Sequence, residues 1–241
     1  MNNQTIYIYR PKNLDRRLWR YMSFLKFVDL LQRRCLWFTR LDQFQDPYEG
    51  FLPEIISGRS GGEPRTVQPD FAYDSWRKTA CANSWYMSDY ESAAMWDLYS
   101  KDGGVAVTSR VSRLEQSFPP DFDSGAWGLY GNAVKYVDFE TAQLQTIDAQ
   151  DAVIRASELL CKRKSFEHEQ EYRMLLTLEK DEQDRDIRGK FVPVVLEQLI
   201  EEVYVSPTAP TWVAEVVRKA VQTYNLDVPV IQSDLYAPVV K

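Results

Sequence analysis

The sequence has a single histidine, His168, and only three cysteines among 241 residues. A single imidazole excludes zinc sites built from several histidines and any mechanism that needs two imidazoles. We therefore predict no metal ligands. The cysteines are odd in number and widely spaced, which is typical of a reduced protein rather than of a disulfide framework. No apolar run approaches the about 18 residues of a membrane span, and residues 1–10 lack the apolar core of a signal peptide. The sequence therefore predicts a cytoplasmic protein without a membrane segment.

The chain also has no excess of basic residues. The formal net charge is −6, which disfavours broad binding of nucleic acid. The charge is uneven, because residues 1–40 carry a net +7 and the rest of the chain −13. This basic segment has two interpretations: it faces an anionic ligand, or it docks on the acidic remainder of the chain.

What the chain does contain is enough apolar and aromatic material for a packed core, with 44% hydrophobic residues and 13% aromatic ones. Strand patterns occupy residues 4–10, 18–23, 36–39, 78–85, 103–110, 132–139, 172–178, 191–196, 201–206 and 228–233. Helix patterns occupy residues 23–35, 88–100, 150–164 and 211–224. The elements do not follow a strict βαβ order, so we predict an α+β class with mixed or antiparallel sheets and flanking helices.

The ends of several predicted elements have recognisable signals. Ser23 is expected to be the N-cap of the first helix. Ser88, followed by Glu91 three residues later, predicts a capping box at the start of the second. The basic run 162–164 suits the C-terminus of the third helix. Residues 58–70 are rich in glycine and proline and predict a mobile loop, and residues 179–190 predict a charged, hairpin-like loop.

The stretch SFEHEQEYRMLLTL, residues 165–178, places Glu167, Glu169 and Glu171 at every second position. In an extended segment these three side chains share one face. Like charges on one buried face push a carboxyl toward protonation, and such an arrangement is tolerated more readily at a functional site. The alternative is an ion-pair network with nearby bases. The candidate bases are Lys162, Arg163, Lys164 and Arg173.

Four stretches taken together resemble the bacterial family of unknown function DUF2971. They are residues 21–50 with DPYEG, 81–85 with CANSW, 92–107 with MWDLY, and 164–176 with EHEQEYR. The order and spacing of these blocks agree with the family pattern from residue 18 to about 206. We therefore expect one domain over residues 1–241, with a family-like core at 18–206 and a C-terminal helix and strand at 211–233 packed on it.

The layout of that family in turn resembles the ADP-ribosyltransferase fold, which implies roles for particular residues. Glu171 would hydrogen-bond the ribose 2′-hydroxyl and stabilise an oxocarbenium-like state, and Glu169 would accept a proton from the nucleophile. Arg20 would grip the pyrophosphate, and Ser84 would order the nicotinamide ribose. The implied cofactor-binding set is Arg20, Tyr21, Ser84 and Trp85, with the two aromatic rings stacking on nicotinamide or adenine. Packing in the core is the alternative for these rings.

The resemblance thus implies an NAD-dependent ADP-ribosyltransferase or NAD glycohydrolase, with NAD as substrate, in a phage-defence or toxin–antitoxin setting. A nucleic acid would be a partner only as acceptor. Two alternatives stay open. One is a non-catalytic binding module, an antitoxin or sensor, whose acidic face meets a basic protein partner. The other is a Mg²⁺-dependent nuclease that uses Asp46, Glu49, Glu169 and Glu171.

Overall fold

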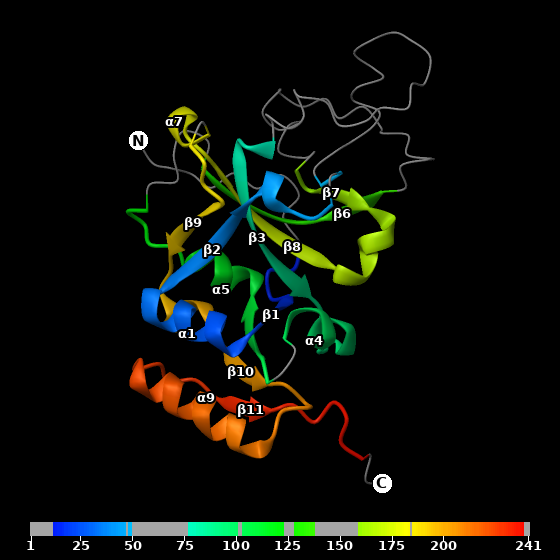
Figure 1. The fold of residues 1–241 in the computed structure, drawn as a ribbon, viewed down its shortest axis with the longest axis vertical. Coiled ribbons are helices and arrows are strands. Elements are labelled where there is room, and N and C mark those ends of the chain that lie inside the picture. Colours follow the sequence, from blue (N-terminus) through cyan, green and yellow to red (C-terminus); the bar gives the residue numbers. More distant parts are fainter. Residues whose placement is uncertain are drawn as a thin grey trace. The chain divides into compact units, whose positions relative to one another are not determined.

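The computed structural model describes residues 12–46, 48–49, 77–100, 103–122, 128–137, 159–183 and 185–238 (Figure 1). The predicted strand 4–10, the predicted loop 58–70 and the first part of the helix predicted over 150–164 lie outside these residues. The chain divides into two compact units, each assembled from separate stretches. Unit 1 consists of Met1–Pro11, Trp37–Ser84 and Asp123–Lys190, and unit 2 of Lys12–Leu36, Trp85–Phe122 and Phe191–Lys241. The α+β class is confirmed, and a single domain over residues 1–241 stays a prediction.

The sheet of unit 1 follows the strand order β9-β2-β3-β8-β5. These strands are β2 (Cys35–Arg40), β3 (Ala80–Met87), β5 (Leu129–Ala133), β8 (Glu171–Thr177) and β9 (Gly189–Pro193). Three of them belong to this unit only in part, β2 from Trp37 on, β3 up to Ser84 and β9 up to Lys190. β5 and β8 are antiparallel with Asn132 opposite Arg173. β6 (Lys135–Val137) and β7 (Cys161–Arg163) form a separate parallel pair. Leucine and alanine side chains and one tyrosine fill one core cluster of this unit: Leu41, Ala80, Ala82, Tyr130, Leu159, Leu160 and Leu175.

The sheet of unit 2 follows the order β11-β10-β4-β1, with the Trp85–Met87 part of β3 paired to β1. Its strands are β1 (Arg17–Met22), β4 (Val105–Arg110), β10 (Glu202–Val205) and β11 (Val230–Gln232). Its helices are α1 (Phe24–Arg33), α4 (Ala93–Tyr99), α5 (Val111–Gln116), α8 (Leu196–Leu199) and α9 (Thr211–Thr223). Figure 1 shows the long helix α9 running beside β11 and β10, with which it is in contact.

Periodic apolar residues predicted the long helices of unit 2 correctly. Ser23 caps α1 by accepting a hydrogen bond from the Lys26 backbone N–H, and α1 buries Phe27, Leu30 and Leu31. Helix α9 ends within one residue of its predicted C-terminus. No helix in the described part of the chain is long and apolar enough to cross a membrane.

The predicted capping box at Ser88 was wrong. Helix α4 begins at Ala93, and its N-cap is Ser92, whose hydroxyl accepts from the Met95 N–H. Glu91 does not close a box, because its carboxylate accepts instead from the indole N–H of Trp96 at 2.9 Å. The Ser233 hydroxyl donates to the same carboxylate at 2.6 Å, so a tertiary contact has replaced the local capping interaction that the pattern suggested.

The predicted helical ending at residues 162–164 was also wrong. Cys161–Arg163 forms β7, and Lys164 opens the short 3₁₀ helix η2 (Lys164–Glu169). The backbone pairs with β6, and this pairing overrides the local preference of a basic helix end. Near it, the strand predicted over 132–139 is divided between β5 and β6, and the loop predicted over 179–190 contains the short helix α7 (Lys180–Gln183).

Three basic side chains of the N-terminal segment pair with acids that lie beyond residue 40. The guanidinium of Arg17 pairs with Glu202, and that of Arg34 pairs with Glu197. Arg40 lies 2.7 Å from Asp42 and is buried. At these three positions the positive charges meet acids of the chain itself.

Candidate functional site

The three alternating glutamates do not share one strand face, so that prediction was wrong. Residues 164–169 form η2, and Gln170 adopts the left-handed conformation with φ 37° and ψ 51° before β8 begins at Glu171. A 3₁₀ helix has about three residues per turn, so alternating positions diverge around its axis. Glu167 and His168 are exposed, Glu169 is half-buried, and Glu171 is buried.

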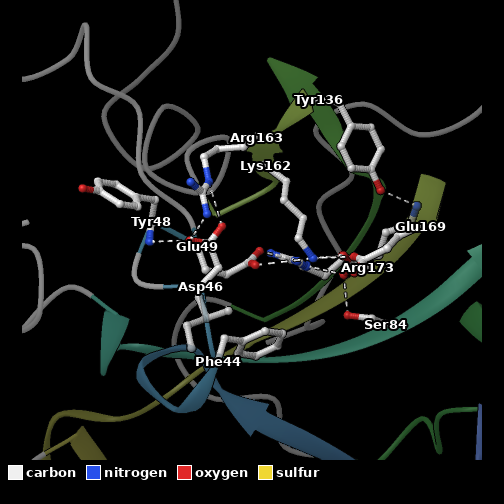
Figure 2. Close-up of polar contacts among 12 residues, drawn as sticks. Phe44, Asp46, Tyr48, Glu49, Ser84, Tyr136, Lys162, Arg163, Glu169 and Arg173 are labelled. Atoms are coloured by element: carbon white, nitrogen blue, oxygen red, sulfur yellow. Dashed lines mark hydrogen bonds and ion pairs between the residues drawn. The ribbon is translucent and has the colours of Figure 1, made fainter. Parts of the chain in front are cut away.

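Arg173 lies at the centre of the polar contacts around Glu171 (Figure 2). Its side chain is fully buried. Its guanidinium grips the Glu171 carboxylate with Nε at 2.6 Å and Nη2 at 2.9 Å. The same Nη2 donates to Glu49 at 2.6 Å, and Nη1 donates to the Leu159 carbonyl at 2.8 Å. All three nitrogens of a buried cation are thus matched by acceptors, as burial of a charge requires.

A second cation, Lys162 of β7, links the same carboxylates. Its ammonium pairs with Glu169 and lies 3.5 Å from a Glu49 oxygen and 3.6 Å from a Glu171 oxygen. We call Glu49, Lys162, Glu169, Glu171 and Arg173 the buried charge cluster. Three carboxylates against two cations give these five side chains a formal net charge of −1.

Neutral groups complete the surroundings of Glu171. The Ser84 hydroxyl, on the neighbouring strand β3, donates to the Glu171 carboxylate. The backbone N–H of Glu171 donates to the Tyr136 hydroxyl at 2.8 Å. The structure therefore brings together two of the predicted site residues, Ser84 and Glu171, and places Glu169 beside them through Lys162.

The pKa of Glu171 reflects this environment. Burial by itself raises the pKa of the carboxyl, but Arg173, Lys162 and the Ser84 hydroxyl more than offset that effect and lower the pKa to about 2. The expectation that crowding pushes this carboxyl toward protonation was therefore wrong, and Glu171 is an anion at neutral pH. Burial also raises the pKa of the Tyr136 hydroxyl, which stays protonated.

The loop that contains DPYEG is held against β7 and β8. Arg163 binds the Asp46 carboxylate with two nitrogens, at 2.8 and 3.2 Å, and the Tyr48 N–H donates to the same carboxylate at 3.0 Å. Arg77 donates to the backbone carbonyls of residues 41, 44 and 46. These contacts of the loop position Glu49 in the buried charge cluster.

The sequence analysis named Lys162 and Arg173 among the candidate bases for the glutamates, and the structure confirms the ion pairs Lys162–Glu169 and Arg173–Glu171. It missed the pairing of nearby bases with the acids of DPYEG, although one signal existed. The acidic DPYEG block and the basic residues of KRKSFEHEQEYR are both prominent in the chain, and the structure pairs Asp46 with Arg163 and Glu49 with Arg173. Tyr136 and Asn132 carried no signal, because single polar residues on a short strand are common.

Arg20, Tyr21 and Trp85 belong to unit 2, and they do not share one face of their strands. Neighbouring residues of a strand point to opposite sides, so Arg20 and Tyr21 diverge on β1, as do Ser84 and Trp85 on β3. The Arg20 guanidinium lies 5.9 Å from the centre of the Trp85 ring, within the range of a cation–π contact. Of the predicted cofactor-binding residues, the structure thus pairs Arg20 with Trp85.

The two aromatic rings of the predicted cofactor set are packed inside unit 2. Tyr21 lies 5.0 Å from Trp96 in an edge-to-face contact, and its hydroxyl accepts from the Ser92 N–H at 2.9 Å. Trp85 is only 1% exposed. In this structure the core interpretation describes both rings, and neither offers an open face for stacking.

The four acids named for the nuclease alternative are occupied by cations of the chain. Asp46 is paired with Arg163, Glu49 and Glu171 with Arg173, and Glu169 with Lys162. Within the described ranges, no group of three or more His, Cys, Asp or Glu side chains is arranged to hold a metal ion. The donor set therefore favours an ion-pair network over a Mg²⁺ site.

Comparisons with known proteins agree with part of what the sequence predicted. Residues 95–174, about a third of the chain, match the family model described as "Protein of unknown function (DUF2971)", which confirms the resemblance over the MWDLY and EHEQEYR blocks. A comparison with curated proteins gave no match. Among solved structures, the chain is similar to Thermus sp. 2.9 DarT in complex with ADP-ribosylated ssDNA, with 10% identity, a TM-score of 0.38, and coverage of 93% of this chain and 96% of that chain. A likeness this distant identifies no corresponding residues.

Proposed function

We propose that this chain is an NAD-using enzyme, an ADP-ribosyltransferase or NAD glycohydrolase, with Glu171 as its main catalytic residue. The observation that carries the proposal is the contact between the Ser84 hydroxyl and the ionised Glu171 carboxylate on neighbouring strands. A hydroxyl beside a carboxylate is a pair of groups that hydrogen-bonds the hydroxyls of a ribose. The proposed setting, phage defence or toxin–antitoxin function, rests on the family resemblance alone.

The proposed chemistry is cleavage of the bond between nicotinamide and ribose. The ring carbon develops positive charge as this bond breaks, and a fixed carboxylate nearby stabilises that charge. A pKa of about 2 keeps Glu171 ionised throughout the physiological range. Arg173 and Lys162 are positioning residues in this proposal, because they hold the carboxylate without touching substrate.

Glu169 takes the second role in the proposal. Its side chain is more exposed than that of Glu171, 13% against 5%, so a nucleophile reaches it more readily. Its carboxylate would accept the proton that the attacking water or acceptor hydroxyl gives up. Lys162, which pairs with it, keeps this carboxylate directed toward the buried charge cluster.

The residues present fit the ribose of NAD better than its two aromatic rings. Ser84, Glu169 and Glu171 supply hydroxyl and carboxylate groups of the required kind. Arg20 remains our proposed pyrophosphate ligand, because a guanidinium binds phosphate oxygens through two hydrogen bonds. Tyr21 and Trp85 would need to leave their packed positions to stack on a base, so we give them no stacking role here.

One observation favours a second candidate, a non-catalytic binding module. Both oxygens of Glu171 and all three nitrogens of Arg173 are already engaged within the chain. A fully satisfied buried network of this kind also occurs where the charges only fix a structure. In that case the cluster would shape a loop surface for a partner, and NAD would be irrelevant.

The deciding experiment is to incubate the purified chain with NAD and to quantify free nicotinamide by chromatography. Glu171→Gln keeps the side-chain volume and removes the charge, so we expect nicotinamide release to fall by at least about 100-fold, the scale of losing one electrostatic stabiliser. Nicotinamide release by Ser84→Ala should fall less than release by Glu171→Gln. Glu167→Gln is the matched control, because it changes an exposed glutamate of the same stretch outside the cluster.

Circular dichroism must show that each variant is folded before rates are compared. Release by wild type and Glu167→Gln, but not by folded Glu171→Gln, is the outcome that the proposal requires. If folded wild type releases no nicotinamide and NAD does not raise its melting temperature, the enzyme proposal fails and the binding module becomes the working function.

A further inference from the structure

Asn132 of β5 has a buried side-chain amide with no hydrogen-bond partner within the described part of the chain. The residue is 1% exposed, and both Nδ2 and Oδ1 lack a partner. Buried amides are almost always hydrogen-bonded, because a donor or acceptor removed from water without a partner is unfavourable. An orphaned amide therefore indicates a group that the described part of the chain does not supply.

The register of the sheet places Asn132 beside the buried charge cluster. Asn132 lies directly opposite Arg173 in the antiparallel pair of β5 and β8. Residues paired in this way point to the same face of a sheet. Glu171, two residues from Arg173 on the same strand, is then a diagonal neighbour at about 7–8 Å. The orphaned amide consequently faces the same region as the carboxylate that Ser84 contacts.

The chemistry of the amide limits what it can recognise. An asparagine side chain offers an acceptor oxygen and N–H donors side by side. Its complement is an edge that presents a donor and an acceptor side by side, such as a primary carboxamide. A carboxylate offers acceptors only, and the formal charge of −1 on the neighbouring cluster disfavours an anion. A neutral carboxamide meets both conditions.

We propose that Asn132 is the specificity residue that recognises the carboxamide of nicotinamide through a pair of hydrogen bonds. This inference rests on the proposed function, in which Glu171 and Ser84 lie at the ribose that carries nicotinamide. The residue diagonal to Glu171 is then near the ring attached to that ribose. The amino edge of adenine shares the same donor–acceptor chemistry, so the experiment has to separate the two sources.

The experiment measures direct binding rather than turnover. The full chain is titrated by calorimetry with nicotinamide, benzamide, nicotinate and adenine. We expect nicotinamide and benzamide to bind, and nicotinate and adenine to bind at least tenfold more weakly. Asn132→Asp, which replaces the donors by a second acceptor, should weaken carboxamide binding at least tenfold, or about 1.4 kcal/mol. Asn132→Leu should abolish it.

Thermal unfolding without ligand supplies the control for a purely structural role. Asn83 is the matched residue, because it is equally buried, on strand β3 at the other side of β8, but donates to the Trp37 carbonyl at 2.9 Å. Asn83→Leu should lower the melting temperature, since it removes an existing hydrogen bond. Asn132→Leu should leave the melting temperature unchanged or raise it, since it removes an unsatisfied amide.

Any one of four results would overturn the inference. Carboxamides do not bind wild type, or bind Asn132→Leu as well as wild type. Asn132→Leu lowers the melting temperature as much as Asn83→Leu, which means that a buried water satisfies the amide. Adenine binds in an Asn132-dependent manner while nicotinamide does not, which assigns the residue to the other end of the dinucleotide.

These results are distinct from failure of the proposed enzyme activity. Cleavage of NAD that does not depend on Asn132 rejects this inference and leaves the activity standing. Carboxamide binding that depends on Asn132, without any cleavage of NAD, rejects the activity and leaves a carboxamide-binding site.

Discussion

The two units differ in the charge that they bury beside their apolar cores. Unit 1 holds five charged groups, the buried charge cluster, between its strands and the DPYEG loop. Unit 2 instead packs aromatic and apolar side chains: Trp19, Tyr21, Tyr86, Met95, Trp96 and Ala106. Its ion pairs, such as Arg34 with Glu197, lie in partly exposed positions.

This difference indicates where specific chemistry is to be sought. Burying apolar surface stabilises a fold without demanding exact partners. Burying charge loses hydration, and the mutual attraction of a buried pair often does no more than offset that loss. A fold gains little stability from the cluster that apolar residues would not also provide, whereas a preorganised carboxylate is useful for catalysis or recognition.

The largest effect is expected from removing the central cation of unit 1. Arg173→Met leaves Glu171 and Glu49 buried without their main partner, so the free energy of unfolding should fall by about 3–5 kcal/mol. Urea unfolding at neutral pH measures this. The double variant Arg173→Met with Glu171→Gln should recover part of the loss. A single-variant loss below about 1 kcal/mol would show that the cluster is not held by this guanidinium.

A core truncation in unit 2 should cost a similar amount for a different reason. Phe27 is fully buried on α1, and Phe27→Ala should lower the free energy of unfolding by about 3–5 kcal/mol through lost apolar burial and a cavity. This loss should be the same at pH 3 and pH 7, while the Arg173→Met loss should shrink at pH 3 as carboxylates protonate. Equal pH dependence of the two variants would contradict the contrast between the units.

The next effect in size is the pH dependence of the free energy of unfolding that Glu171 causes. Its folded pKa of about 2 lies below the ordinary value of 4.5, so its stabilisation is complete above about pH 4.5 and is lost as pH falls toward 2. The difference corresponds to roughly 3 kcal/mol. Denaturant unfolding of wild type and Glu171→Gln between pH 2 and pH 7 should converge at the acidic end. Parallel curves would mean that this carboxyl has an ordinary pKa in the fold.

The smallest effect is expected from an exposed ion pair of unit 2. Asp29 and Arg33 are one turn apart on α1, with side chains about half exposed. Asp29→Asn should change the free energy of unfolding by less than about 0.5 kcal/mol, and salt should reduce even that, because water screens such a pair. Urea titrations at low and high salt check this prediction. A loss near that of Arg173→Met would remove the distinction between buried and exposed charge.

Much of the secondary structure followed from the sequence by itself. Helices α1 and α9 were predicted within about two residues, because each buries one periodic face of its own residues. Strands β1, β4 and β8 were predicted equally well from short apolar runs, although β4 and β8 are buried on both faces. These elements depend on neighbours in the chain, which a sequence lists directly. The sequence also singled out Ser84, Glu169 and Glu171 through a family pattern, and their roles as site residues stay a prediction.

Only the tertiary structure decided how the charges are matched. Glu49 meets Arg173 across 124 positions, and Glu171 meets Ser84 across 87. Gln170 has a positive φ between Glu167 and Glu171, and no local sequence pattern predicted this turn of the backbone. The pKa of Glu171 is lowered because its carboxylate is bound by Arg173, whereas the crowding of glutamates had suggested a raised pKa. Long-range pairing and burial set these energies, and neither can be read from spacing along the chain.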